Sequence, residues 1–320
     1  MRRNKKNTLC QFERSREPRN ERYSRTSTSL GLTSFRKHFD KLSVTAILLI
    51  LFSCKKNIDV KIPDYVEKLV VEGKIETGKN PEVYLSYTVP YFGNHTSSLS
   101  DFAVKGALIT VNDGTSVDTL KPVVASVGYY YKANTMIGAV GKTYYLTIQL
   151  NGKTYTSNTS INPVVNLDTL WFKVIKDDTL GFIYTHMHEP PAPGNCYRWF
   201  AQRINKDASF IAPLGSSFDD KFINGKSFDF AYNRGMLQNS TATDDNNAAA
   251  AYFVKGDQVI VKFCAIGENE FLFFRSYDAN IVSNGNPFAA PSNLQNNIQG
   301  ENVLGVWCGY SPFIDTLVCQ

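Results

Sequence analysis

Short runs of alternating hydrophobic and polar residues recur along the chain from residue 65 onward. The first are KLVVEGKIE (68–76) and EVYLSYTVP (82–90), and FAVKGALITVNDG (102–114) ends in a turn signal. Alternation with a period of two buries one set of side chains and leaves the other set in water. These runs predict β-strands, and about six or seven of them before residue 163 favour an immunoglobulin-like β-sandwich over residues 65–163.

The clearest local signal is a hairpin within KTYYLTIQLNGKTYTSNTSI (142–161). Leu146, Ile148 and Leu150 alternate with more polar neighbours, and Asn151-Gly152 separates this arm from the next. Asn-Gly between two alternating arms strongly favours a two-residue turn, because both residues tolerate positive φ. The segment therefore predicts two adjacent antiparallel strands.

Beyond Pro163 we expect a second, β-rich domain over residues 164–320. Strand patterning restarts at 168–189 and returns at 196–204 and 257–266. Asn, Asp, Ser, Ala and Gly dominate residues 205–251, which predicts a long loop region.

One helix is expected in this second domain, at GENEFLFFRSYDANIVSNGN (267–286). Phe273, Tyr277 and Ile281 are four residues apart and would share one face of a helix. Gly285 lies just beyond the predicted end, where glycine is favoured. The whole chain is thus predicted to be mainly β.

A different pattern precedes these domains and ends at Cys54. Arg36, Lys37 and Lys41 come before the apolar run Leu42–Phe52, and small Ser53 stands directly before the cysteine. Eleven helical residues reach about 16 Å, which is about half of a bilayer's hydrocarbon core. The run looks like a bacterial lipoprotein signal, although a short buried helix is the alternative.

The expected chemistry at Cys54 is lipidation. Its thiol would accept a diacylglyceryl group as a thioether, and a peptidase would then cut between Ser53 and Cys54. Residues 1–53 would be removed and residues 54–64 would form a polar tether. Two or three acyl chains hold a protein stably on a membrane, so no transmembrane helix is required.

The charge of the chain supports this division. The full chain has 34 Lys and Arg against 29 Asp and Glu, and residues 1–53 hold 12 of the former and 4 of the latter. Residues 54–320 therefore carry 22 against 25, a net charge of −3. A mildly acidic protein lacks the clustered positive charge that nucleic-acid binding requires, so we exclude that class.

Four cysteines follow Cys54 in an even set: Cys196, Cys264, Cys308 and Cys319. They allow three disulfide pairings in an oxidising compartment, and Cys308 with Cys319 would close a short terminal loop. Buried free thiols are the alternative. The spacings lack the close CxxC pairs of a structural zinc site.

His186 and His188 are the weak candidates for a metal site. They flank Met187 on a predicted strand, so both imidazoles would project from one face. A site needs a third ligand, and the other histidine after Cys54 is His95, in the first domain. The alternative is two strand-face histidines next to a turn. We therefore expect no cofactor and no metal.

Other polar and aromatic groups give weaker signals. Asp244–Asn247 could offer oxygen ligands to calcium but have no organised loop around them, and the adjacent Asp219 and Asp220 would point to opposite faces of a strand. The nucleophile-elbow, HExxH and phosphate-loop motifs are absent from the sequence. Trp171, Trp199 and Trp307 could line a sugar or peptide groove, or belong to the core. We predict that the protein is not an enzyme.

Several segments in a fixed order resemble a known family. They are the cysteine of the lipoprotein signal, YVEKLVVEGKIETGKNPEVYLSYTVPYF (65–92), YYLTIQLNGKTYTS, GNCYRWF (194–200), DDKFINGKSF (219–228) and NPFAAPSNLQNNIQGENVLGVWCGYS (286–311). The chain is similar to Bacteroidota lipoproteins of the domain-of-unknown-function family 4249. The resemblance implies an outer-membrane lipoprotein that acts beside TonB-dependent transporters, with no assigned catalytic activity.

We therefore expect a non-catalytic, lipid-anchored envelope protein that is an accessory binding component of an outer-membrane uptake system. The membrane, through the lipid, and a TonB-dependent transporter are its expected partners, and the small ligand stays unassigned. The alternatives are a secreted or periplasmic metal-dependent hydrolase and a structural or adhesion component. Because Lys55 and Lys56, rather than acidic residues, follow Cys54, both the periplasmic face and the cell surface stay open.

Overall fold

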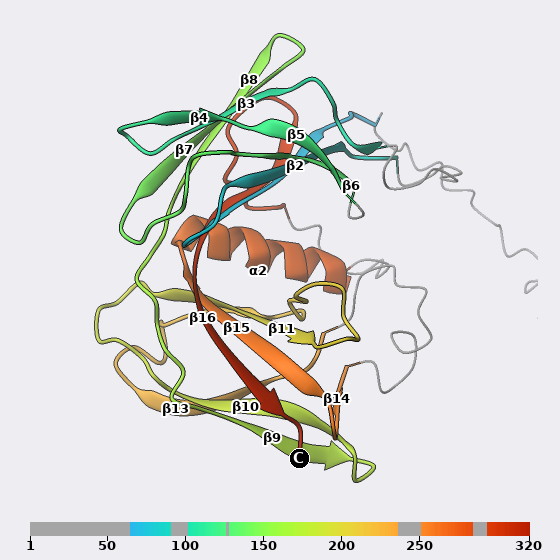
Figure 1. Cartoon of the computed structure of the whole chain (residues 1–320), viewed down its shortest axis with the longest axis vertical. Coiled ribbons are helices and arrows are strands. Elements are labelled where there is room, and N and C mark those ends of the chain that lie inside the picture. The colour runs from blue at the N-terminus through green and yellow to red at the C-terminus, as the bar shows by residue number, and fades with distance from the viewer. Residues whose placement is uncertain (1–64, 91–101, 126–127, 236–250, 284–292) are drawn as a thin grey trace, which may run out of the picture. The chain divides into compact units, whose positions relative to one another are not determined.

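Strands make up most of the chain that the computed structural model describes, namely residues 65–90, 102–125, 128–235, 251–283 and 293–320 (Figure 1). The described part is mainly β, as the sequence pattern predicted, and contains several sheets and one helix. Residues from 64 onward form one compact unit. The predicted leader and tether, residues 1–64, lie outside the described residues.

The largest sheet has eight strands in the order β12-β11-β15-β16-β1-β2-β6-β5. Its strands are β1 (Leu69–Glu76), β2 (Glu82–Tyr87), β5 (Lys121–Ala125), β6 (Gly128–Lys132), β11 (Cys196–Arg203), β12 (Ser217–Asp219), β15 (Gln258–Ile266) and β16 (Val303–Val318). The first half of β16 pairs in parallel with β1, and its second half pairs in antiparallel with β15. One long strand therefore joins the two halves of the sheet.

Two four-stranded sheets pack against this large sheet. The first has the order β4-β3-β7-β8, and the second has the order β13-β10-β14 with β9 beside β10. Their strands are β3 (Leu108–Asn112), β4 (Val117–Thr119), β7 (Thr143–Leu150), β8 (Lys153–Ser160), β9 (Thr169–Lys176), β10 (Leu180–His188), β13 (Ser227–Tyr232) and β14 (Phe253–Val254).

The first core lies between the large sheet and the four-stranded sheet β4-β3-β7-β8. Strands β1, β2 and β6 form one side of this core, and β3, β7 and β8 form the other. Ile75, Val83, Ile109 and Tyr144 are completely buried in it. Trp307 of β16 belongs to the same core, although it lies far beyond residue 163. The expected domain division at residue 163 therefore does not coincide with a break in the sheet.

The predicted hairpin is confirmed. β7 and β8 pair in antiparallel along their whole length, and Asn151 and Gly152 form the turn with φ values of 51° and 75°. Two successive positive φ values are typical of the type I′ turn, which matches the twist of the flanking strands.

A second core lies between β11 and β15 on one side and β9, β10 and β13 on the other. Trp199, Phe263 and Met187 are completely buried there. Phe230 and Tyr232 of β13 pack against this core. The prediction of one long loop over residues 205–251 is thus wrong for Ser217–Asp219 and Ser227–Tyr232, which form β12 and β13. Phe and Tyr side chains of these two strands pack against the second core and give this polar region enough apolar surface to complete a sheet.

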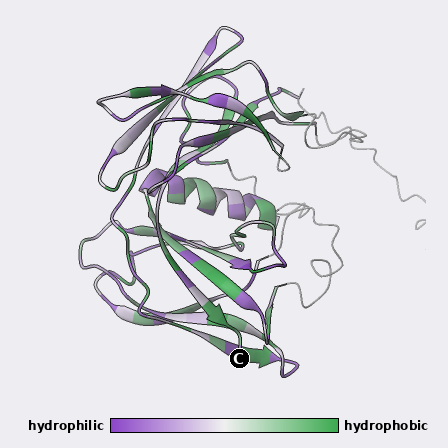
Figure 2. Ribbon diagram, viewed as in Figure 1, coloured by the Kyte–Doolittle hydropathy of each residue, from purple (hydrophilic) through white to green (hydrophobic). Residues whose placement is uncertain are grey.

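The predicted helix is confirmed as α2 (Glu268–Ser283). Phe271 and Phe274 pack on the face of the large sheet that carries Cys264, Val306 and other buried side chains of β11, β15 and β16. β15 is therefore buried on both faces, and its ribbon is hydrophobic over most of its length (Figure 2).

Side-chain hydrogen bonds connect the last strand to its surroundings. The side-chain amide of Asn297 donates from Nδ2 to the backbone carbonyl of Trp307, and its Oδ1 accepts from the backbone amide of Trp307, both at 2.9 Å. The backbone carbonyl of Asn297 accepts a hydrogen bond from the hydroxyl of Ser157. Thr159 of β8 donates to Glu270 of α2 at 2.6 Å. The first core, β16 and the helix are therefore linked by polar contacts as well as by packing.

A buried ion pair crosses the junction of the two halves of the large sheet. Lys262 of β15 contacts the carboxylate of Glu76 on β1, and Lys79 contacts the other oxygen. Burial by itself raises the pKa of Glu76, but the two ammonium groups outweigh it and leave the pKa below its ordinary value. The rings of Phe200 and Tyr310 lie 5.3 Å from the Lys262 ammonium, which adds cation–π attraction.

Replacement of Gly305 tests the close approach of β16 to β1. A Cβ atom at Gly305, which has a φ of 143°, would overlap the carbonyl oxygen of Val71. Because a backbone clash cannot be relieved by rotating a side chain, we expect Gly305→Ala to lower the free energy of unfolding by about 3 kcal/mol or more. Equilibrium urea unfolding of the wild type and the variant measures this loss.

The matched control is Gly114→Ala, since Gly114 has a φ of 87° and open space around it. Only backbone strain is added there, so the expected loss is about 1 kcal/mol. Equal losses in the two variants would contradict the packing of β16 on β1.

Candidate functional site

The outer face of the sheet that contains β10 is the candidate site. Along β10, Ile183, Thr185 and Met187 are buried, whereas His186 and His188 face away from the core. The alternation is the ordinary consequence of a two-residue period on a strand with one solvated face. The prediction that both histidines share a strand face is confirmed.

Stacked aromatic rings occupy the next part of this outer face. Trp171 of β9 stacks on Tyr184 of β10 with ring centroids 5.6 Å apart, and Phe182 stacks on Tyr252 at 5.2 Å. The ammonium of Lys173 lies 5.5 Å from the Tyr184 ring. These half-buried rings contribute to no core cluster, so they are available to pack against a ligand or a partner.

The two histidines lie beside carboxylates that the strand register supplies. Asp168 stands just before β9, and its Oδ2 atom is 3.6 Å from Nε2 of His188. On the other side, Asp229 of β13 lies 2.6 Å from Nδ1 of His186. Ser227 contacts Nδ1 of His188. One potential ligand atom from each of Asp168, His186 and His188 lies within 4.8 Å of the others.

The sequence pointed to the histidines but not to their acidic neighbours. Asp168 and Asp229 lie 18 and 43 positions from His186, and only pairing of β9 and β13 with β10 brings them together. A direct signal would have been the alternation in SFDFAY (227–232), which places Ser227 and Asp229 on one face. The predicted loop over residues 205–251 includes that stretch.

The three tryptophans have different positions. Trp199 and Trp307 are fully buried in the two cores, so a groove lined by all three is excluded. Trp171 alone among them lies on the outer face of a sheet. The alternative that the tryptophans belong to the core therefore holds for Trp199 and Trp307.

Asp220 of the acidic pair Asp219 and Asp220 is engaged in contacts within the fold. Asp220 is buried and accepts hydrogen bonds from the backbone amides of Gly194 at 2.7 Å and Asn195 at 2.9 Å. Glu189 is also buried, and accepts from Tyr197 and the amide of Gly225. The two carboxylates hold the segments that lead into β11 and β13.

The four later cysteines are buried free thiols. Cys308 and Cys319 are 11 residues apart along the unbroken β16 and its end, a distance of roughly 36 Å in extended chain, whereas a disulfide needs Cα atoms about 4.4–6.8 Å apart. The possibility that a Cys308–Cys319 disulfide closes a short terminal loop is therefore wrong. Cys196, Cys264 and Cys308 share the core beneath α2.

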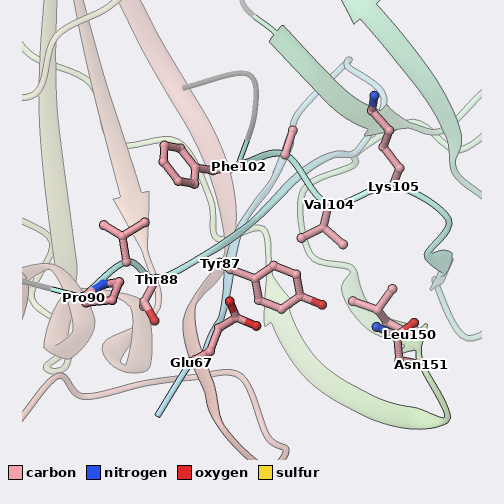
Figure 3. Close-up of a pocket in the computed structure, with 11 residues that line it drawn as sticks. Glu67, Tyr87, Thr88, Pro90, Phe102, Val104, Lys105, Leu150 and Asn151 are labelled. Carbon is pink, nitrogen blue, oxygen red and sulfur yellow. The ribbon is translucent and has the colours of Figure 1, made fainter. Parts of the chain in front are cut away.

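A separate cavity of about 570 Å³ lies at the end of β2 (Figure 3). Glu67, Tyr87 and Thr88 line one part of it, and Phe102 and Lys105 line another. Its volume is in the range of small-molecule sites, and its lining mixes charged and apolar groups. The cavity is remote in sequence from β9, β10 and β13.

Three of the sequence-based candidates lie outside the described residues: Cys54, His95 and the segment Asp244–Asn247. Within the described residues, no helix is both long and apolar enough to cross a membrane.

Comparison with known families gives one match. A family model described as a domain of unknown function (DUF4249) matches residues 55–313, which is well over half of the chain. The chain belongs to the DUF4249 family. The predicted resemblance to this family is confirmed, whereas the lipoprotein character and the source phylum stay predictions. A search of the curated proteins found no match.

Several segments that carry the DUF4249 resemblance contain residues that make specific contacts within the fold. GNCYRWF and DDKFINGKSF meet through Asp220 and through the pairing of β11 with β12. In the last segment, Asn297 binds Trp307, Ile298 is buried in the first core, and Gly300 approaches the ring of Tyr155. These segments therefore determine contacts within the fold.

Thiol reactivity tests the burial of the cysteines. Burial raises the pKa of Cys196, Cys264 and Cys319 to about 12, and it raises the pKa of Cys308 as well. At pH 8 the nucleophilic thiolate is scarce, so a thiol reagent should modify these four cysteines at least about tenfold more slowly in the folded protein than in urea. Peptide mass spectrometry measures each site. A disulfide-linked peptide, or equal rates in both states, would contradict the structure.

Proposed function

We propose that the protein is a lipid-anchored, non-catalytic binding protein that serves as an accessory component of an outer-membrane uptake system with a TonB-dependent transporter. The observation that carries the proposal is the run Leu42–Cys54, with its basic flank, short apolar stretch and small residue before the cysteine. Membership of DUF4249, a family without an assigned activity, is compatible with it.

The folded unit begins close to the proposed anchor. Tyr65 is fixed by its hydroxyl to Thr88, at the end of β2. The 11 residues from Cys54 to Asp64 would extend at most about 40 Å. A lipidated Cys54 would therefore keep the folded unit near the membrane surface, where a membrane partner can be reached.

The aromatic outer face formed by Trp171, Tyr184, Phe182 and Tyr252 is the proposed contact surface for the transporter. Large rings that stack outside the core offer apolar area with little loss of side-chain entropy on binding, and Trp and Tyr often carry most of the energy of an interface. Lys173 beside Tyr184 adds a positive charge.

The arrangement of the carboxylates supports a non-catalytic role. Glu76, Glu189 and Asp220 are buried and engaged in contacts that hold the fold together. Among the described residues, the alternative, a metal-dependent hydrolase, would use Asp168, His186 and His188. These residues lie on an open sheet face, whereas the described cavity is lined by other residues.

Replacement of Cys54 tests the anchor. We expect Cys54→Ala to release the protein from the membrane fraction and to abolish incorporation of labelled palmitate, because the alanine has no thiol to acylate. Cys319→Ala, which removes a buried thiol distant from the signal, is the matched control and should leave both properties unchanged. Continued membrane association of an unlabelled Cys54→Ala protein would refute the lipoprotein assignment.

Affinity purification from detergent-solubilised membranes tests the partner. We expect the wild-type protein to retain a β-barrel transporter, identified by mass spectrometry, and Trp171→Ala to reduce its recovery about tenfold or more. Phe222→Ala removes another exposed ring, 78% accessible and outside this face, and should have no effect. Recovery of the protein alone, or equal recovery with both variants, would argue against the proposed role.

A further inference from the structure

Three side chains at one end of the outer face converge without contributing to a core. His186 and His188 project from β10, and Asp168 approaches them from the residue that precedes β9. We propose that Asp168, His186 and His188 bind a divalent transition metal of the zinc type. This inference does not depend on the proposed role in uptake.

The distances suit such an ion. Zinc binds nitrogen and carboxylate oxygen at about 2.0–2.2 Å, so two ligands of a tetrahedral site lie about 3.3 Å apart. Nε2 of His188 and Oδ2 of Asp168 are 3.6 Å apart. All three ligand atoms fall within 4.8 Å of one another, so small side-chain rotations would complete the geometry.

The second contact of each ring supports the assignment. Ligand histidines usually engage their other ring nitrogen with a carboxylate or another polar group, which fixes the ring and its tautomer. Nδ1 of His186 is 2.6 Å from Asp229, and Nδ1 of His188 contacts Ser227. Both partners come from β13, directly opposite the histidines in the strand register. Nε2 of each ring is therefore left for the metal.

The backbone holds the ligands in place. The amide of Asp168 donates to the carbonyl of His186 at 2.9 Å, and β10 pairs with β9 and β13 on its two sides. Ligands on paired strands lose little freedom when a metal binds. The set is two imidazoles and one carboxylate, which suits zinc, and the exposed position leaves the fourth coordination site for water or for an anionic oxygen of a ligand.

Zinc titration of the detergent-solubilised full chain, purified without a polyhistidine tag and freed of metal by a chelator, tests the proposal. Calorimetry should show one equivalent of Zn²⁺ bound by the wild type. His188→Ala and Asp168→Asn should each weaken binding about tenfold or more, because each removes a ligand, and Asp229→Asn should weaken it by about tenfold because it releases the His186 ring. Zinc-edge X-ray absorption should show two imidazole ligands.

His95→Ala and Asp178→Asn are the matched controls, and both should bind zinc as the wild type does. The side chain of His188 is 67% exposed, so its replacement should not disturb the fold, and circular dichroism checks this. His188→Gln, which can still contact Ser227, provides a second variant if His188→Ala unfolds. The proposal is overturned if the wild type shows no saturable binding up to about 1 mM zinc, or if the His188 variants bind with unchanged affinity.

Discussion

The double pairing of β16 holds the two halves of the large sheet together. Its first eight residues, Val303–Tyr310, lie parallel to β1, and the next eight, Ser311–Val318, lie antiparallel to β15. β1 and β16 come from opposite ends of the described chain, so their pairing closes a loop of more than two hundred residues. Closing such a loop costs entropy, and burial of Trp307 and its neighbours in the first core offsets that cost. Without β16, neither half of the large sheet is complete.

Polar contacts strengthen the same junction. Glu76 on β1 and Lys262 on β15 meet in the interior, and removing Glu76 would leave the buried Lys262 ammonium without its carboxylate partner. Because the pKa of Glu76 is lowered in the folded state, its contribution to stability is present above the ordinary glutamate pKa and is lost as the pH falls through the lowered value. Glu270 differs, since burial raises its pKa and favours the neutral form beside Thr159.

The sheets differ in which of their faces are buried. β15 is buried on both faces, and the inward side chains of β10 and β13 complete the second core. The rings on the outer face of β9 and β10 belong to no core cluster, and beside them this face carries two histidines and two carboxylates. By contrast, the segments that identify the family make contacts within the fold, as Asn297 does with Trp307. The segments that carry the family resemblance therefore describe the scaffold.

Local sequence patterns were sufficient to predict much of the secondary structure. Alternation predicted β1, β2, β7 and β8, Asn151-Gly152 predicted the hairpin, and the four-residue spacing of Phe273 and Tyr277 predicted α2, because each pattern reflects contacts between residues close in the chain. The tertiary structure alone decided that β16 joins both halves of the large sheet and that Ser227–Tyr232 is a strand. It also decided that Asp168 and Asp229 flank the histidines. Those features depend on pairing between distant segments, and the period of one strand does not specify its partner.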